Sequence, residues 1–198
     1  MPDSGNSTYS RRAVFCDRDG VINEDHGYVH QWDDFHIFAG VPEALASLKK
    51  AGWLLVLVTN QSGIARGYYD ESAFLRLTQQ MQNFLSDKGA HFDGVYFCPH
   101  SPLSDDDSLS VGCNCRKPRP GMFLQAKEDL GINMGASVCV GDKPTDIAAA
   151  KLAKVGKAFG VGRAADFTNC RPDFLALHPS SALQQILQLT VVSEHTRA

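Results

Sequence analysis

The sequence predicts an α/β fold, a three-layer Rossmann-like arrangement in which a parallel sheet carries helices on both faces. Short apolar runs, typical of strands buried on both sides, alternate along the chain with amphipathic stretches at helical spacing. The length of 198 residues suits one compact domain. Polar residues follow several of the apolar runs directly, as expected at the carboxyl edge of an open sheet, where ligands bind.

Five short apolar runs are predicted strands. The clearest is Leu54–Val58, which is apolar throughout, as a strand buried on both faces requires. The others are Ala13–Cys16, Gly94–Phe97, Val138–Val140 and Ala158–Val161.

Five amphipathic stretches between and after these runs are predicted helices. In chain order they are Val41–Lys50, Asp70–Lys88, Pro120–Leu130, Asp146–Ala153 and Ser181–Leu189. Pro42 suits the first turn of the first helix. Asp70 is expected to cap the second, whose apolar side chains recur at helical spacing until Gly89. Thr145 is the expected N-cap of the fourth.

The composition excludes several classes of protein. With 43% hydrophobic and 21% charged residues, the chain is too apolar to be disordered. Its net charge of −3 argues against a protein that coats nucleic acid. No apolar stretch reaches the ~20 residues of a membrane span, and the first ten residues lack the apolar core of an export signal. We therefore expect no binding to nucleic acid or membranes. Because the clustered cysteines suit a metal rather than disulfides and no export signal is visible, we expect a cytoplasmic protein. We expect a monomer, because the sequence shows no strong exposed apolar stripe.

The domain organisation follows from the same patterns. The predicted strands and helices fall within residues 11–190, which we expect to form a single domain. Residues 1–10 form a polar N-terminal extension, and residues 191–198 form a C-terminal tail.

Two carboxylates follow the first predicted strand. Asp17 and Asp19 lie two residues apart, and Gly20 allows the chain to turn tightly after them. Such carboxylates repel each other unless a cation joins them, so the pair is a natural site for a hard divalent cation. The same residues also suit a plain surface turn.

Three further segments are predicted to meet this pair at the sheet edge. Thr59 and its neighbours follow the second strand and offer small donors for phosphate oxygens. Lys117 supplies a positive charge that suits a phosphoryl group. Asp142 and Asp146 form a second acidic pair ahead of a helix. Each segment alone fits a loop, but the four together predict a site for phosphoryl chemistry.

A second constellation consists of cysteines and a histidine within residues 98–115. Three thiolates and one imidazole form a set typical of structural zinc, although the Cys-x-His and Cys-x-Cys spacings are less specific than the commoner motif. The alternative is a set of unrelated thiols beside a surface histidine. The polar segment between them, Ser101–Ser110, is expected to be a solvated loop. The predicted ligands are Cys98, His100, Cys113 and Cys115.

From about Arg12 to Leu189 the sequence resembles the haloacid dehalogenase-like phosphohydrolases. The matching segments are Asp17-Arg18-Asp19-Gly20-Val21, Thr59-Asn60, Lys117, and Gly141-Asp142 with Asp146. The resemblance implies that Asp17 attacks phosphorus and that Asp19 transfers the protons. It also implies that Thr59 and Lys117 hold the phosphoryl group.

The same resemblance implies a catalytic Mg²⁺, held by Asp17, the main-chain carbonyl of Asp19, and Asp142. Whether Asp146 contacts the cation or orients its waters stays open.

Cys-Pro-His and Cys-x-Cys-Arg-Lys-Pro are similar to one branch of this family, which includes histidinol phosphatases and heptose bisphosphate phosphatases. The branch has a zinc-pinned loop and no large cap domain. The segments 23–29 and 59–67 are similar to the heptose bisphosphate phosphatases in particular. This likeness implies removal of the C7 phosphate of D-glycero-D-manno-heptose 1,7-bisphosphate, a step in lipopolysaccharide core biosynthesis. Arg116 is implied as a further active-site residue. The implied substrate-binding residues are Asp25, His26, Gly27, Tyr28, Asn60, Gln61, Ser62 and Lys143.

Two alternatives remain open at this point. Histidinol phosphate, or another small phosphomonoester, is the nearest alternative substrate. A non-catalytic module built on the zinc loop is the alternative from another class of protein.

Overall fold

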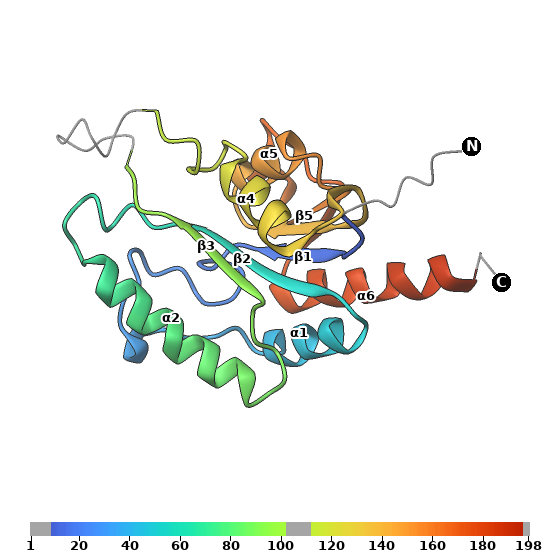
Figure 1. Cartoon of the computed structure of the whole chain (residues 1–198), viewed down its shortest axis with the longest axis horizontal. Helices are drawn as coiled ribbons and strands as arrows, with labels where there is room; N and C mark the ends of the chain where they lie inside the picture. The colour runs from blue at the N-terminus through green and yellow to red at the C-terminus, as the bar shows by residue number, and fades with distance from the viewer. Residues whose placement is uncertain (1–8, 102–111, 196–198) are drawn as a thin grey trace, which may run out of the picture.

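The computed structural model describes residues 9–101 and 112–195 and places six parallel strands in one sheet, in the order β3-β2-β1-β4-β5-β6 (Figure 1). This confirms the predicted three-layer architecture. Strands β1 and β4 lie at the centre, flanked by β2 and β5, and the residues of β1, β2 and β4 are almost all buried because both faces are covered. The strands are β1 (Ala13–Cys16), β2 (Leu54–Asn60), β3 (Gly94–Cys98), β4 (Val138–Gly141), β5 (Lys157–Val161) and β6 (Phe174–Ala176).

Helices cover both faces of the sheet (Figure 1). One apolar cluster joins α1, α2 and α6 to one face, and a second joins α4 and α5 to the other. Along β1 the side chains alternate between the clusters, with Val14 and Cys16 in the first and Ala13 and Phe15 in the second. The helices are α1 (Val41–Lys50), α2 (Glu71–Ser86), α4 (Gly121–Leu130), α5 (Pro144–Leu152) and α6 (Pro179–His195).

Short 3-10 helices complete the connections. Between β1 and α1 the chain forms a loop that contains only η1 (Trp32–Asp34), rather than an inserted cap domain. The other two are η2 (Met134–Ala136) and η3 (Ala164–Phe167).

All ten predicted elements are present; β1 and α1 have the predicted ends, and the ends of the others are shifted. The side chain of Asp70 accepts a hydrogen bond from the amide of Ala73 and caps α2, as expected. The prediction for α5 is wrong at its start. Lys143 is the N-cap in place of Thr145, and the carboxylate of Asp146 accepts the main-chain N–H of Lys143. Pro144 at the first helical position explains the earlier start, because its fixed φ suits that position.

Two differences concern the C-terminal third. The sequence patterns missed β6, whose three residues are too few to show a period, and which lies at the sheet edge beside β5. The last helix is longer than predicted, because α6 runs from Pro179 to His195. Within the described residues, no helix is both long and apolar enough to cross a membrane. Of the predicted solvated loop, residues 102–110 lie outside the described part.

Candidate active site

Predicted site residues lie at the carboxyl ends of three neighbouring strands, at one edge of the sheet. Asp17 follows the last residue of β1, Thr59 lies near the end of β2, and Asp142 follows β4. The amide of Asp17 donates to the carbonyl of Val140 across the sheet at 3.1 Å, which fixes where the chain leaves β1. Because the strands are parallel, their carboxyl ends meet here, as predicted.

Three carboxylates form a cluster at this edge. Ligand oxygens of Asp17, Asp142 and Asp146 all lie within 4.8 Å of one another. Two glycines make room for the cluster, since a Cβ on Gly20 would lie 2.3 Å from an oxygen of Asp142, and one on Gly141 would lie 2.3 Å from the Cβ of Asp146. Gly20 also has a φ of +87°, which disfavours any other residue.

Burial and mutual repulsion disfavour the charged forms of these acids. Burial is the main reason that the pKa of Asp17 rises, and Asp146 adds to it, against the opposing effect of Lys117. Burial, together with the negative charges of Asp17 and Asp146, raises the pKa of Asp142 to about 8. The cluster therefore needs positive charge to be stable as carboxylates.

Lys117 supplies one such charge from within the protein. Its side chain is 1% exposed and contacts Asp17 at 2.9 Å and Asp146 at 2.7 Å. The ammonium also donates to the carbonyl of Val58 at 2.8 Å. Burial alone would lower the pKa of Lys117, but the two carboxylates raise it above its usual value, so the lysine is charged. Lys143, which is half exposed, adds a second positive charge 3.7 Å from Asp142, so two lysines face three acids.

The donor set fits a hard divalent cation. All three residues offer carboxylate oxygens, the ligand type that Mg²⁺ and Ca²⁺ prefer. Oxygen Oδ1 of Asp142 is buried and has no hydrogen-bond partner among the described residues, which is costly unless a cation occupies the space beside it. Oδ1 of Asp146 also lacks a hydrogen-bond partner among these residues, but it forms an ion pair with Lys117 at 2.7 Å, and Oδ2 accepts from the amide of Lys143 at 2.9 Å.

Asp19 lies beside this cluster but faces a different set of groups. Its carboxylate accepts from Arg18, from the Asn23 amide at 3.0 Å, and from the Gln61 amide at 3.1 Å. The same Gln61 nitrogen donates to the hydroxyl oxygen of Thr59 at 2.8 Å. Two predicted groups, Asp19 and Thr59, are thus connected through one amide.

Arg18 is a residue whose part in the site the sequence analysis missed. Its side chain is 1% exposed, pairs with Asp19 at 3.0 Å, and donates to the carbonyl of Val29 at 2.6 Å. It lies over the rings of Phe35 and Phe74, 5.8 Å from each centroid. The only sequence signal was its place between two acids, because its partners come from distant segments.

A cleft of roughly 490 Å³ opens above the site. Lys143 lies in the wall of the cleft and forms an ion pair with Asp25 at 3.0 Å. Of the residues predicted for substrate, His26 is the one that does not line the cleft; it is exposed and pairs with Glu24 instead. Tyr69 and Thr145, which were not predicted, do line it. The lining comprises Asp19, Asp25, Gly27, Tyr28, Asn60, Gln61, Ser62, Tyr69, Arg116, Lys117, Lys143 and Thr145.

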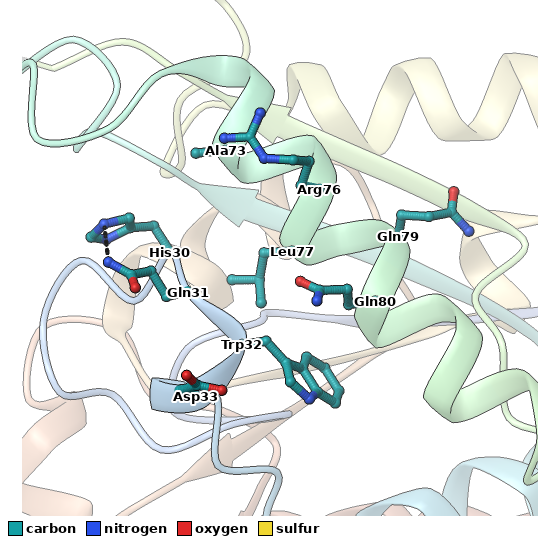
Figure 2. A pocket seen from close by; sticks show the side chains of 9 residues that line it. All are labelled: His30, Gln31, Trp32, Asp33, Ala73, Arg76, Leu77, Gln79 and Gln80. Atoms are coloured by element: carbon teal, nitrogen blue, oxygen red, sulfur yellow. Dashed lines mark hydrogen bonds between the residues drawn. The ribbon is translucent and has the colours of Figure 1, made fainter.

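A larger groove, of roughly 720 Å³, lies elsewhere and contains none of the predicted site residues. Figure 2 shows it between the segment that carries His30 and Trp32 and the side chains of α2, among them Arg76 and Gln80. Because Asp19 and Lys117 line the smaller cleft, and Lys117 contacts Asp17 at 2.9 Å, the chemistry is assigned there.

The cysteine and histidine set also converges. Potential ligand atoms of the four predicted residues lie within 4.8 Å of one another. Nδ1 of His100 lies 3.4 Å from the sulfur of Cys98 and 3.3 Å from that of Cys115, and the sulfurs of Cys98 and Cys113 are 3.8 Å apart. Three sulfurs and one imidazole nitrogen at this spacing could hold a tetrahedral metal ion.

This cluster is tied directly to the active site. Arg116 follows Cys115 and donates to the carbonyl of His100 at 2.9 Å. Asn60, at the end of β2, forms two hydrogen bonds with the main chain of Lys117. Its side-chain oxygen accepts from the Lys117 N–H at 3.1 Å, and its side-chain nitrogen donates to the Lys117 carbonyl at 3.2 Å. The metal-binding set and β2 therefore hold the Arg116–Lys117 turn from two sides.

Comparison with known proteins agrees with the fold and shows the family. A parallel sheet with acids, a threonine and a lysine at its carboxyl edge is the arrangement expected of a phosphohydrolase. Residues 8–154 match the haloacid dehalogenase-like hydrolases. The chain belongs to this family.

Individual relatives show which members of this family the chain is similar to. The chain is 56% identical over 144 residues to the D-glycero-beta-D-manno-heptose-1,7-bisphosphate 7-phosphatase of Photorhabdus laumondii, covering 73% of this chain and 77% of the relative. It is 51% identical over 144 residues to the protein of the same name from Escherichia coli K12, with 73% and 75% covered. Among solved structures, the D,D-heptose 1,7-bisphosphate phosphatase of B. bronchiseptica, complexed with magnesium and phosphate, superimposes with a TM-score of 0.79 at 32% identity, over 89% of this chain and 98% of that one.

Proposed function

We propose that this protein is a divalent-cation-dependent phosphatase that hydrolyses the C7 phosphate of D-glycero-D-manno-heptose 1,7-bisphosphate. The observation that carries the proposal is the convergence of Asp17, Asp142 and Lys117 beside a polar cleft. The relatives that share half or more of their aligned residues are named for this activity. The chemistry requires a nucleophile, a proton-transfer group and positive charge, and the site offers all three.

In the first step, an oxygen of Asp17 attacks phosphorus and the bond between phosphorus and the sugar oxygen breaks. Asp19 gives a proton to the departing oxygen, so the products are an aspartyl phosphate and the free hydroxyl of the sugar. Splitting the hydrolysis into two displacements lowers the barrier of each. Lys117, 2.9 Å from Asp17, balances the charge of the transferred group.

In the second step, Asp19 takes a proton from a water molecule, which attacks the aspartyl phosphate. The acyl phosphate bond breaks at phosphorus, inorganic phosphate leaves, and Asp17 is again a free carboxylate. Asp19 thus acts as acid and then as base, which returns it to its starting state.

A bound Mg²⁺ would supply charge that offsets the repulsion between a carboxylate nucleophile and a phosphate dianion. Asp17, Asp142 and the main-chain carbonyl of Asp19 would hold it. Asp146, whose two oxygens already bind Lys117 and the amide of Lys143, would orient the waters of the cation.

The remaining cleft residues would bind the sugar and its second phosphate. Lys143 and Arg116 are the cationic groups for phosphate, and Asp25 is a hydrogen-bond acceptor for sugar hydroxyls. Gly27, Tyr28 and Ser62 would complete the wall that faces the sugar. His26, which pairs with Glu24, would contact the sugar only if its loop moved.

The experiment that tests the function is a phosphate-release assay with and without Mg²⁺. The substrates are the heptose bisphosphate, histidinol phosphate and a panel of sugar monophosphates. We expect the heptose bisphosphate to be preferred, and ³¹P NMR to show loss of the C7 signal with the C1 phosphate retained. A strong preference for histidinol phosphate would overturn the sugar assignment, and release from no substrate would overturn the activity.

We propose in addition that the Cys₃His set holds a structural Zn²⁺. Its function would be to order the Arg116–Lys117 turn rather than to touch substrate. Cys113→Ser is expected to lower zinc content and thermal stability and to reduce kcat indirectly. Metal analysis of protein prepared without added zinc provides the test, and the absence of bound metal would contradict the proposal. Cys170→Ser, which changes a cysteine outside the cluster, is the control.

Three further proposals concern the context of the enzyme. It would act in the cytoplasm, a reducing compartment, since none of the six cysteines forms a disulfide in the structure and three of them belong to the proposed zinc site. It would be a monomer in solution, which light scattering tests, and would bind no nucleic acid or membrane. Residues 11–190 would form the single phosphohydrolase domain, with the segments 1–10 and 191–198 dispensable for activity.

A further inference from the structure

The amide of Gln61 is connected to three side chains at once. Its nitrogen donates to Asp19 at 3.1 Å and to Thr59 at 2.8 Å, and its oxygen accepts from the hydroxyl of Tyr69 at 2.6 Å. Gln61 is only 2% exposed, so it has little access to water in place of these partners. The amide and its tyrosine partner therefore form a fixed unit beside the proton-transfer group.

Elementary chemistry determines which way this amide faces. An ionised carboxylate can only accept hydrogen bonds, so the amide nitrogen must face Asp19 when Asp19 is charged. The amide oxygen then points away from Asp19, and it is buried, so it needs a donor. The Tyr69 hydroxyl is that donor. Without it, the buried oxygen would be unpaired, and rotating the amide would bring its oxygen against the carboxylate.

The ring of Tyr69 is held in place independently of its hydroxyl. It stacks on His30 with centroids 5.0 Å apart and planes 8° from parallel. A Cβ on Gly63 would lie 2.2 Å from the ring, so the glycine at that position allows the close approach. Burial raises the pKa of Tyr69 to about 12, and the hydroxyl therefore keeps its proton at any physiological pH.

We propose that Tyr69 is a positioning residue for the phosphatase reaction, acting through Gln61 on Asp19 and Thr59. Its hydroxyl fixes the amide of Gln61 so that Asp19 faces the leaving oxygen of the substrate and Thr59 keeps its orientation. The proposal rests on the proposed function of the site and adds a residue outside the four motif segments. It also assigns the Gln61 side chain to Asp19 and Thr59 rather than to substrate.

The test is Tyr69→Phe, which removes one oxygen and keeps the ring against His30. We expect kcat/KM for the heptose bisphosphate to fall about tenfold, the size typical of a weakened proton transfer. With p-nitrophenyl phosphate, whose leaving group departs with little need of a proton, we expect a fall of no more than about twofold. A purely structural defect would lower both rates equally, and that result would overturn the proposal.

Two further variants sharpen the test. Tyr96→Phe removes a tyrosine hydroxyl that donates to Asp129 far from the site, and it should leave both rates unchanged. Gln61→Ala should lower activity itself, and adding Tyr69→Phe to it should cost nothing more, because the hydroxyl then has nothing to act upon. Additive losses in the double variant would overturn the proposal.

A measurement that does not depend on enzymatic activity tests the role of Tyr69 separately from the proposed function. The side-chain NH₂ of Gln61, assigned by its loss in Gln61→Ala, should exchange slowly with solvent in the wild-type protein. In Tyr69→Phe, exchange should be at least about tenfold faster. Equal exchange in both proteins would contradict the Tyr69 proposal whatever the substrate, whereas a wild-type protein that releases no phosphate would contradict only the proposed function.

Discussion

Lys117 is the buried cation that stabilises the acidic cluster in the metal-free protein, with the more exposed Lys143 lying 3.7 Å from Asp142. It lies against Asp17 and Asp146, and all three are almost fully buried. Removing one partner of such a group leaves uncompensated charge, which typically costs about 3–5 kcal/mol.

We therefore expect Lys117→Met to lower the free energy of unfolding by about 3 kcal/mol or more in EDTA, and by less in Mg²⁺, because the cation supplies part of the lost charge. Urea denaturation under both conditions measures the effect. Lys49→Met is the matched control: Lys49 pairs with Asp93 at 2.9 Å in a more exposed position, so its loss should cost about 1 kcal/mol or less. An equal loss with and without Mg²⁺ would contradict a shared electrostatic role.

Replacing Asp17 is expected to change the catalytic rate without changing the stability of the fold. Asp17→Asn keeps the shape of the side chain and removes a buried negative charge that burial already disfavours. We expect kcat to fall on the order of 10³-fold or more, while the melting temperature changes little. Phosphate release and calorimetry provide the two measurements. Near-normal turnover in this variant would exclude the covalent route through Asp17.

At the scale of elements, the site depends on how the chain from Cys113 to Lys117 is fastened to its neighbours. The N-terminus of α4 holds one side, because the amide of Gly121 donates to the carbonyl of Asn114 at 2.9 Å. The end of β2 holds the other through Asn60. The metal-binding set lies between these two attachments, so its order and that of Lys117 are linked.

We expect Gly121→Ala to loosen this attachment, since the added Cβ would lie 2.2 Å from the Asn114 carbonyl oxygen, a backbone atom that cannot move without the loop. Zinc should dissociate faster to a chelator, and kcat should fall by about tenfold as Lys117 loses its place.

The matched change is Gly135→Ala, where the nearest atom is 3.6 Å away and φ is ordinary. A competitive chelator assay and steady-state kinetics on both variants decide the matter. If Gly121→Ala releases zinc no faster than Gly135→Ala, the proposed coupling between α4 and the metal-binding set is wrong.

Elements also show why some of the fold could not be predicted from the sequence. A strand that is buried on both faces is apolar throughout, as Leu54–Val58 is, so it can be predicted from the sequence. Strand β6 has only three residues at the sheet edge, too few to show a periodic pattern. The start of α5 was misplaced because Thr145 is a better N-cap by residue type than Lys143. Pro144, with its fixed φ, outweighs that preference.

At the scale of the whole molecule, parallel topology is what made the site predictable. Once Asp17, Thr59 and Asp142 were assigned to the ends of parallel strands, their convergence followed from the sheet itself. The contacts that cross between loops did not follow from it. The contacts of Arg18 with Asp19 and of Tyr69 with Gln61 are made by side chains, so both needed three-dimensional positions. The place of Asp146 beside the other carboxylates, in contrast, was predicted from the sequence.

The stability of the whole molecule should depend on pH through this cluster when no cation is bound. The pKa of Asp142 is about 8 in the folded protein, far above the ~3.9 of an unfolded aspartate. Between those two values the folded state binds more protons than the unfolded state, so this group makes stability fall as pH rises from about 4 to 8. A divalent cation takes the place of the proton and removes the penalty.

We therefore expect the rise in melting temperature on adding Mg²⁺ to be larger at pH 8 than at pH 6, because at pH 6 the cation must first displace a proton. Differential scanning calorimetry of the wild-type protein at both pH values, with Mg²⁺ or with EDTA, measures the difference. In Asp142→Asn the side chain no longer titrates, and the dependence on pH should largely disappear together with most of the Mg²⁺ effect. A wild-type protein stabilised equally at both pH values, or more at pH 6, would mean that Asp142 is already ionised without the cation and that the carboxylate cluster is balanced by the protein alone.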